Sequence, residues 1–269
     1  MKFAEKLLAA SKKNRSLLCV GLDPDPDLMP RVGLFEFNKA IIDATVDLVC
    51  AYKPNLAFYE ASGIEGIEAL YQTIHYIPSH IPIIGDAKRG DIGNTAKAYA
   101  RALFDTLGCD AVTVSPYLGF DSLEPFIEYE DRGVFILCRT SNPGAKDFQS
   151  LVDAEGVPLY QRVARKANEW NGRGNIGLVV GATYPEELKQ VRILCPDMLL
   201  LIPGVGTQGG DLQESVKYGI DSLGEKAILA VSRQILYASQ GKAFNQSARH
   251  SAQEIRDKIN VLIDSAEAT

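Results

Sequence analysis

The chain has 269 residues, of which 46% are hydrophobic and 23% charged, so it is long enough to bury a full core. Its net charge of −6 argues against nucleic acid as a partner, because DNA and RNA binders carry basic patches. No apolar stretch approaches the roughly 20 residues that a membrane span needs. The charged, alanine-rich segment 1–14 lacks the apolar middle of a signal peptide, so we expect no membrane association and a cytoplasmic location.

Short apolar runs alternate with helix-like segments along the whole chain. This alternation is typical of βα units that build a parallel sheet buried on both faces. The pattern predicts eight strands, over Leu17–Asp23, Ala51–Asn55, Ile83–Asp86, Ala111–Ser115, Gly133–Arg139, Ile176–Gly181, Leu199–Pro203 and Ala227–Ser232.

Helix signals lie between these runs. Asn38 is predicted to cap a helix that extends to Val49, and Pro185 fits the first turn of a later helix. Apolar periodicity predicts further helices over 1–13, part of 232–241 and roughly 251–266.

Nearly every predicted strand ends in a polar or conformationally special residue. A closed barrel gathers all its strand ends on one face, whereas an open, doubly wound sheet concentrates functional ends at one switch point. We therefore predict an α/β fold, a single (β/α)8 TIM-barrel domain over 1–269 with an extra N-terminal helix. An open sheet is the alternative. The strand-end residues are Asp23, Lys53, Asp86 with Lys88, Ser115, Thr140 with Ser141, Pro203 and Arg233.

Three charges of alternating sign, Asp86, Lys88 and Asp91, mark the end of the third predicted strand. Side chains two apart on a strand share a face, so Asp86 and Lys88 should project together, with Asp91 on the loop beyond. Two neighbouring carboxylates keep a lysine protonated, which suits a group that supplies a proton. The alternative is a surface salt bridge.

The loops after strands seven and eight predict a phosphate site. A glycine-rich loop spans 203–211 and Ser232 and Arg233 follow the eighth strand, the positions where barrels commonly bind phosphate. Glycines allow close backbone approach and Arg233 offers a two-pronged donor, while Gln208 would bridge to the rest of the ligand. The loop lacks the triphosphatase and dinucleotide patterns, which favours a phosphomonoester. A tight turn without a ligand is the alternative.

Asp23 and Lys53 end neighbouring strands, within expected reach of Asp86 and Lys88. A lysine on a buried strand needs carboxylate partners, although Asp23 would also serve as a turn former before Pro24. The chain Lys53, Asp86, Lys88, Asp91 would be preorganised charge of the kind that stabilises a transition state. Scattered cysteines and three histidines leave little for a zinc site, while a carboxylate-bound Mg²⁺ stays open.

The chain resembles the orotidine 5′-phosphate decarboxylase family, in its longer bacterial branch. The family's Asp-x-Lys-x-x-Asp segment is present as Asp86 to Asp91. The other matching segments, in the family's order, are Gly21-Leu-Asp23, Lys53-Pro-Asn55, Thr140-Ser-Asn-Pro-Gly144, Pro203-Gly-Val-Gly-Thr-Gln208 and Ser232-Arg233.

This resemblance implies a homodimer without a cofactor or metal. Asp91, Ile92 and Thr95 would enter the partner's site, while Lys53, Asp86 and Lys88 would serve their own. Asp23 and Lys53 would bind ribose hydroxyls, Ser141 the pyrimidine, and Gln208 with Arg233 the phosphate. Pro203, Gly206 and Ser232 complete the expected substrate-binding set, and Asn142 has no assigned role.

The implied reaction converts orotidylate to UMP and CO₂ in pyrimidine biosynthesis. Lys88 would stabilise the carbanion at C6 and protonate it, and Asp86 would face the departing carboxylate. The rival enzyme is a sugar-phosphate lyase that uses Mg²⁺ to stabilise an enediolate. A rival that is not an enzyme is a non-catalytic sensor of phosphate ligands. A second, phosphoribosyltransferase domain is not expected, because the barrel uses the whole chain.

Overall fold

The computed structural model describes residues 1–206 and 209–267 of the chain. Its strands form one sheet of eight, all parallel, in the order β2-β1-β8-β7-β6-β5-β4-β3. The strands are β1 Leu18–Leu22, β2 Ala51–Pro54, β3 Ile84–Arg89, β4 Ala111–Val114, β5 Gly133–Arg139, β6 Ile176–Val180, β7 Leu199–Pro203 and β8 Ala227–Val231.

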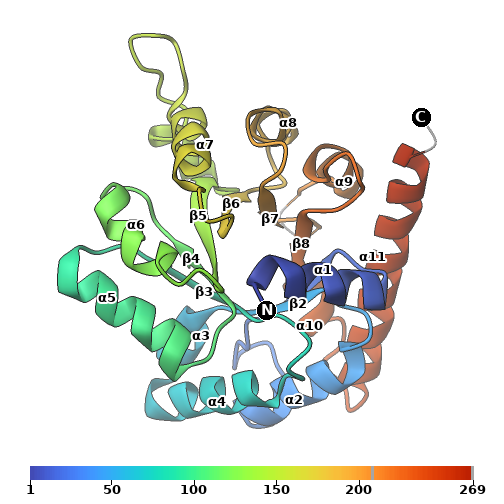
Figure 1. The fold of residues 1–269 in the computed structure, drawn as a ribbon. Coiled ribbons are helices and arrows are strands. Elements are labelled where there is room, and N and C mark those ends of the chain that lie inside the picture. The colour runs from blue at the N-terminus through green and yellow to red at the C-terminus, as the bar shows by residue number, and fades with distance from the viewer. Residues whose placement is uncertain (207–208, 268–269) are drawn as a thin grey trace.

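The two strands at the ends of this order, β2 and β3, meet and nearly close the sheet. Parallel bridges join Tyr52 to Ile83 and Asn55 to Asp86, and the Tyr52 N–H donates to the Pro82 oxygen at 3.0 Å. The strands therefore form a barrel with helices around it, as Figure 1 shows. The predicted (β/α)8 TIM barrel is confirmed, and the open-sheet alternative is wrong.

Helices alternate with the strands and surround the barrel (Figure 1). Among the described residues, none of them combines the length and apolar character that a membrane crossing requires. They are α1 Phe3–Asn14, α2 Leu34–Thr45, α3 Leu56–Glu60, α4 Gly63–Tyr76, α5 Gly93–Arg101 with a π-helical continuation Ala102–Thr106, α6 Phe120–Ile127, a 3₁₀ turn Pro143–Asp147, α7 Leu159–Trp170, α8 Pro185–Leu194, α9 Leu212–Gly219, α10 Arg233–Leu236 and α11 Phe244–Glu267.

The helix predicted around Asn38 differs from the structure. Helix α2 begins at Leu34 and ends at Thr45, so Asn38 lies inside it rather than at its cap, and Val49 lies beyond it. The Asn38 amide is fully buried and donates to the Tyr59 hydroxyl at 2.9 Å and to Thr73 Oγ1 at 3.0 Å. These tertiary partners satisfy the amide nitrogen of a side chain that would otherwise favour a helix end, while its Oδ1 has no hydrogen-bond partner among the described residues.

Three further boundaries compare with the prediction as follows. Pro185 occupies the first turn of α8. Helix α11 begins at Phe244, earlier than the predicted 251, and β3 continues to Arg89 rather than ending at Asp86. The extension of β3 matters for function, because it places Lys88 on the strand.

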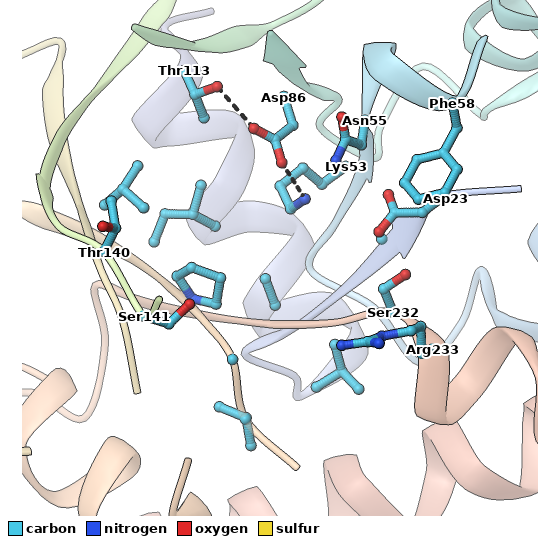
Figure 2. A pocket seen from close by; sticks show the side chains of 18 of the residues that line it. Asp23, Lys53, Asn55, Phe58, Asp86, Thr113, Thr140, Ser141, Ser232 and Arg233 are labelled. Carbon is cyan, nitrogen blue, oxygen red and sulfur yellow. Dashed lines mark hydrogen bonds and ion pairs between the residues drawn. The ribbon is translucent and has the colours of Figure 1, made fainter. Parts of the chain in front are cut away.

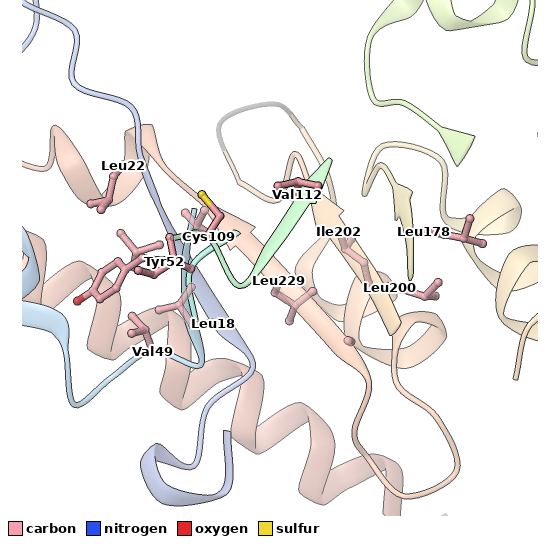
Figure 3. Close-up of a cluster of buried hydrophobic side chains, with 14 of the residues drawn as sticks. Leu18, Leu22, Val49, Tyr52, Cys109, Val112, Leu178, Leu200, Ile202 and Leu229 are labelled. Carbon is pink, nitrogen blue, oxygen red and sulfur yellow. The ribbon is translucent and has the colours of Figure 1, made fainter. Parts of the chain in front are cut away.

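Two groups of buried apolar side chains hold the barrel together. One fills the barrel interior and includes Cys19, Ala111 and Phe135; the other, larger group lies between strands and helices, and Figure 3 shows part of it. Helix α1 closes the amino-terminal end of the barrel, where the Phe3 ring packs edge-on against Phe135 at 5.7 Å between centroids. Lys6 adds an ion pair with Asp110, at 2.7 Å, just before β4.

Candidate active site

A cavity of about 590 Å³ opens at the carboxyl ends of the barrel strands, opposite α1. Figure 2 places Thr113, Asp86 and Lys53 together, Asp23 with Ser232 and Arg233 on one side, and Thr140 with Ser141 on the other. This is the face where TIM barrels carry their active sites. The predicted site residues that line the cavity are Asp23, Lys53, Asp86, Lys88, Ser141, Pro203, Ser232 and Arg233.

Asp86 is the centre of a charged network. Its Oδ2 accepts a hydrogen bond from Lys53 Nζ at 2.8 Å, and its Oδ1 accepts from Lys88 Nζ at 2.6 Å and Thr113 Oγ1 at 3.0 Å. The Lys53 and Asp86 side chains are 8% and 9% exposed, whereas that of Lys88 is 49% exposed. Lys53 and Asp86 are thus a buried fixed pair, and Lys88 is the member that faces the cavity.

The backbone around Lys88 is unusual for a strand. The register between β3 and β4 shifts between Gly85 and Arg89, and Lys88 has a φ of 48°, in the left-handed region that side chains other than glycine rarely adopt. The Lys88 N–H donates to Thr113 Oγ1 at 3.0 Å, so the same threonine holds both Lys88 and Asp86. Strained backbone of this kind collects at functional sites.

Burial and charge act against each other in the network. Burial opposes ionisation of Asp86, but Lys53 and then Lys88 outweigh it and hold the pKa of that carboxyl well below its usual range. Burial likewise acts to lower the pKa of Lys53, and Asp86 with Asp23 outweigh it and raise that pKa above its usual value. Both groups are therefore ionised at neutral pH.

Asp23 and Ser232 present polar atoms that lack partners within the described part of the chain. Asp23 Oδ1 and Ser232 Oγ are both buried and accept or donate no hydrogen bond there, although both residues line the cavity. Buried polar atoms are rarely left unpaired, so their position points to a polar ligand. Lys53 lies close enough to Asp23 for their charges to interact.

The loops after β5 and β6 form the opposite wall. Ser141 lines the cavity, and its backbone oxygen accepts from Thr183 Oγ1 at 3.0 Å. A Cβ atom on Gly181 would lie 2.7 to 2.8 Å from the Ser141 backbone and Cβ, so only glycine allows the two loops to approach this closely. Ser141 therefore lies on the wall of the cavity, and its role as a pyrimidine ligand stays a prediction.

The predicted phosphate end lies between β7 and α10. Pro203, Gly204 and Val205 line the cavity, while Gly206 is exposed, has a φ of 82° and lies against the Gln234 side chain. Arg233 lines the cavity from the start of α10. Gln208, the predicted bridge to the phosphate, lies outside the described residues.

Asp91, Ile92 and Thr95 lie apart from this cavity. Asp91 follows β3 and its Oδ1 accepts from the Ile92 N–H at 2.8 Å, while Ile92 is 56% exposed and Thr95 is exposed on α5. None of the three lines this cavity. Of the four alternating charges predicted from the sequence, the cavity therefore brings together Lys53, Asp86 and Lys88, and Asp91 lies outside it.

Sequence reasoning missed some residues of the cavity. Thr113 left a signal, because it is a polar residue within the apolar strand 111–114, and Asn142 belongs to a loop that the sequence singled out without giving this residue a role. Phe58 and Tyr237 left none, since they come from helix starts and ends that carry no strand-end signal. In the described residues, no group of three or more His, Cys, Asp or Glu side chains is arranged to hold a metal ion.

The sequence and the fold of this chain are similar to those of known proteins. The model of the orotidine 5′-phosphate decarboxylase / HUMPS family matches residues 16–245. The chain is 58% identical over 265 residues to the orotidine 5′-phosphate decarboxylase of Dehalococcoides mccartyi, which covers 97% of this chain and 98% of that protein. It is 56% identical over 258 residues to that of Herpetosiphon aurantiacus, covering 93% and 95% of the two chains. The solved structure of Leishmania donovani OMP decarboxylase matches with a TM-score of 0.88 and 41% identity, over 98% of this chain and 100% of that one. The chain therefore belongs to the orotidine 5′-phosphate decarboxylase / HUMPS family.

Proposed function

We propose that the chain converts orotidine 5′-phosphate to UMP and CO₂ without a cofactor, with Lys88 as the proton donor. The observation that carries this assignment is the network of Lys53, Asp86 and Lys88 at 2.8 and 2.6 Å, buried except for the lysine that faces the cavity. A fixed array of charges is what this reaction requires, because the electron pair left at C6 lies in the ring plane and cannot be delocalised.

The chemical step breaks one carbon–carbon bond and then adds one proton to the carbon that keeps the electron pair. The bond from C6 to the carboxylate breaks, CO₂ leaves, and the electron pair stays on C6 beside the Lys88 ammonium, which then gives its proton to that carbon. Asp86 faces the departing carboxylate, and its ionised state keeps a negative charge next to the group that leaves as neutral CO₂. Lys53 holds Asp86 in place from the buried side.

The remaining cavity residues bind the rest of the substrate. Asp23 accepts hydrogen bonds from the ribose hydroxyls, and Lys53 donates to them. Ser141 contacts the pyrimidine, and Arg233 binds the phosphate together with Gln208. The unpaired Asp23 Oδ1 supports the ribose assignment, because a hydroxyl is a suitable donor for it. Binding energy from the remote phosphate favours closure of the glycine-rich loop and exclusion of water.

The proposed enzyme is a homodimer in which Asp91 and Thr95 reach the partner's site. Large apolar side chains are exposed on the segments that follow the neighbouring strands β3 and β4, up to the first residue of α6, and exposed apolar surface of this kind marks interaction sites. They are Ile92, 56% exposed, and Tyr117, Leu118 and Phe120, exposed by 84%, 47% and 37%. We also propose a cytoplasmic location, which the five free cysteines fit.

The test is the ultraviolet change when purified protein is mixed with orotidylate, with and without EDTA. The proposal predicts rapid conversion to UMP at the same rate under both conditions, because no step uses a metal. Conversion that EDTA abolishes, or no conversion by folded protein, would contradict it. A substrate screen with sugar phosphates and Mg²⁺ would then identify the rival lyase activity.

A further inference from the structure

Tyr237 joins the loop after β8 to the loop after β1, two segments that lie 214 positions apart in the chain. Its hydroxyl donates to the backbone oxygen of Asp23 at 2.7 Å and accepts from the backbone N–H of Asp25 at 2.7 Å. These two residues flank Pro24. One side chain therefore fixes the backbone on both sides of the proline.

The partners of this hydroxyl decide the direction of both hydrogen bonds. A backbone carbonyl only accepts and a backbone N–H only donates, so the single phenolic proton of Tyr237 is committed to Asp23. Burial raises the pKa of Tyr237 to about 12, which keeps that proton in place at neutral pH. Tyr237 lines the cavity, but its proton is already used by the protein and is not available to a ligand.

Aromatic packing fixes the ring that carries this hydroxyl. Phe37 of α2 stacks on Tyr237 with 6.1 Å between centroids and 14° between planes, and Phe244 of α11 stacks on Phe37 at 5.3 Å and 15°. On the other side of the loop, the Tyr59 hydroxyl donates to the Leu22 backbone oxygen at 3.0 Å. The backbone that carries Asp23 is thus held at residues before and after it.

The Asp23 carboxylate is the side-chain group whose backbone these hydrogen bonds hold. Its Oδ1 is buried at the cavity and has no hydrogen-bond partner among the described residues, and its charge interacts with that of Lys53. No side chain in the described structure therefore fixes that oxygen. The position of the carboxylate therefore depends on the backbone that bears it and on its attraction to Lys53.

We propose that Tyr237 is a positioning residue that aims the Asp23 carboxylate at the sugar hydroxyls of the substrate. Tyr237 follows directly on α10, and its N–H donates to the Arg233 oxygen at 3.1 Å, so the segment that carries Arg233 also holds Asp23. The groups for phosphate and sugar thus form one unit. This inference rests on the sugar and phosphate assignments of the proposed function.

The test compares substrates within one variant. We expect Tyr237→Phe to lower kcat/KM for orotidylate by roughly fivefold. The loss should be smaller for the 2′-deoxy and 3′-deoxy analogues, and for at least one of them it should be less than about twofold. The preference for the full ribose therefore shrinks. This preference is a ratio measured on one protein sample, so partial unfolding of the variant does not change it. Tyr76→Phe is the matched control, because it removes an α4 hydroxyl that donates to Asp43 of α2, and it should keep the wild-type preference.

Asp23→Asn separates this inference from the proposed function. If Asp23→Asn leaves the preference for the full ribose unchanged, the sugar assignment of Asp23 is wrong and the positioning role falls with it. If Asp23→Asn lowers the preference but Tyr237→Phe lowers all substrates equally, the assignment of Asp23 stands and the role of Tyr237 is overturned.

Discussion

At the scale of single residues, the site depends on one buried carboxylate. Asp86 accepts hydrogen bonds from Lys53, Lys88 and Thr113, and its side chain is 9% exposed. Removing one partner from a buried ion pair leaves the other charge without compensation. Asp86 therefore both orients the lysine that faces the cavity and makes the burial of Lys53 possible.

This dual role gives a prediction about stability and pH. The pKa of Asp86 is lower in the folded than in the unfolded chain, so its ionisation adds stability at pH values above the unfolded value of about 4, and the gain is lost as the pH falls below it. Asp86→Asn should cost about 3 kcal/mol of unfolding free energy at pH 7. The difference from wild type should shrink between about pH 4 and pH 2.

Urea unfolding at pH 7, 4 and 3 measures this difference. Asp43→Asn is the control, because Asp43 is exposed and pairs with Lys39 on the surface of α2, where an ion pair is worth about 0.5 kcal/mol. Equal loss of stability in both variants, or a loss for Asp86→Asn that does not depend on pH, would show that ionisation of the buried pair does not stabilise the fold.

At the scale of elements, the active site is an arrangement of strand ends and the loops that follow them. The sequence predicted that arrangement because apolar runs locate the strands and a barrel brings all their carboxyl ends to one face. Asp23, Lys53, Asp86, Lys88, Ser141 and Arg233 were found in this way, and the structure brings all of them to one cavity.

Other features depend on contacts that no local pattern encodes. The left-handed backbone of Lys88 lies within a register shift between β3 and β4, and a hydrogen bond of Tyr237 joins residues 214 positions apart. Asn38 was wrongly placed at a helix cap because its buried partners, Tyr59 and Thr73, come from other helices. Tertiary contacts override local preference at each of these positions.

The contact between the loops after β5 and β6 gives a prediction at this scale. Gly181→Ala would place a Cβ 2.7 Å from the Ser141 backbone nitrogen, so the Ser141 loop must move. We expect a rise in KM for orotidylate and a loss of roughly tenfold or more in kcat/KM, since a wall of the pocket is displaced. Steady-state kinetics measure the effect.

Gly172→Ala is the matched control. A Cβ at Gly172 would meet nothing within 4 Å, so this variant should keep wild-type kinetics. If Gly181→Ala behaves like Gly172→Ala, the loop has room to adapt and the close approach to Ser141 has no role in binding.

At the scale of the whole molecule, the two ends of the barrel do different work. Helix α1 closes the amino-terminal end through Phe3 and Lys6, while the charged residues of the site lie at the opposite end. Lys53, Lys88 and Arg233 bring positive charge to a cavity that Asp23, Asp25 and Asp86 also line, so the cavity of a chain with a net charge of −6 holds cations that can meet an anionic substrate. The fold therefore places cations at the binding site although the chain as a whole is negatively charged.

The site of one subunit is incomplete in the proposed account. Lys53, Asp86 and Lys88 lie together, but Asp91 and Thr95 lie outside the cavity of their own chain. A symmetric dimer would place them at the partner's site, since a twofold interface presents the same surface from both subunits. Each site would then need residues from both chains.

Mixing two inactive variants tests this account most directly. Lys88→Ala and Asp91→Ala should each lose nearly all turnover of orotidylate while remaining folded dimers. After the two are unfolded and refolded together in EDTA, roughly a quarter of the wild-type activity should return, because half of the dimers are mixed and each mixed dimer has one intact site. If Lys88→Ala alone turns over orotidylate at the wild-type rate, or if mixing restores nothing, the account is contradicted.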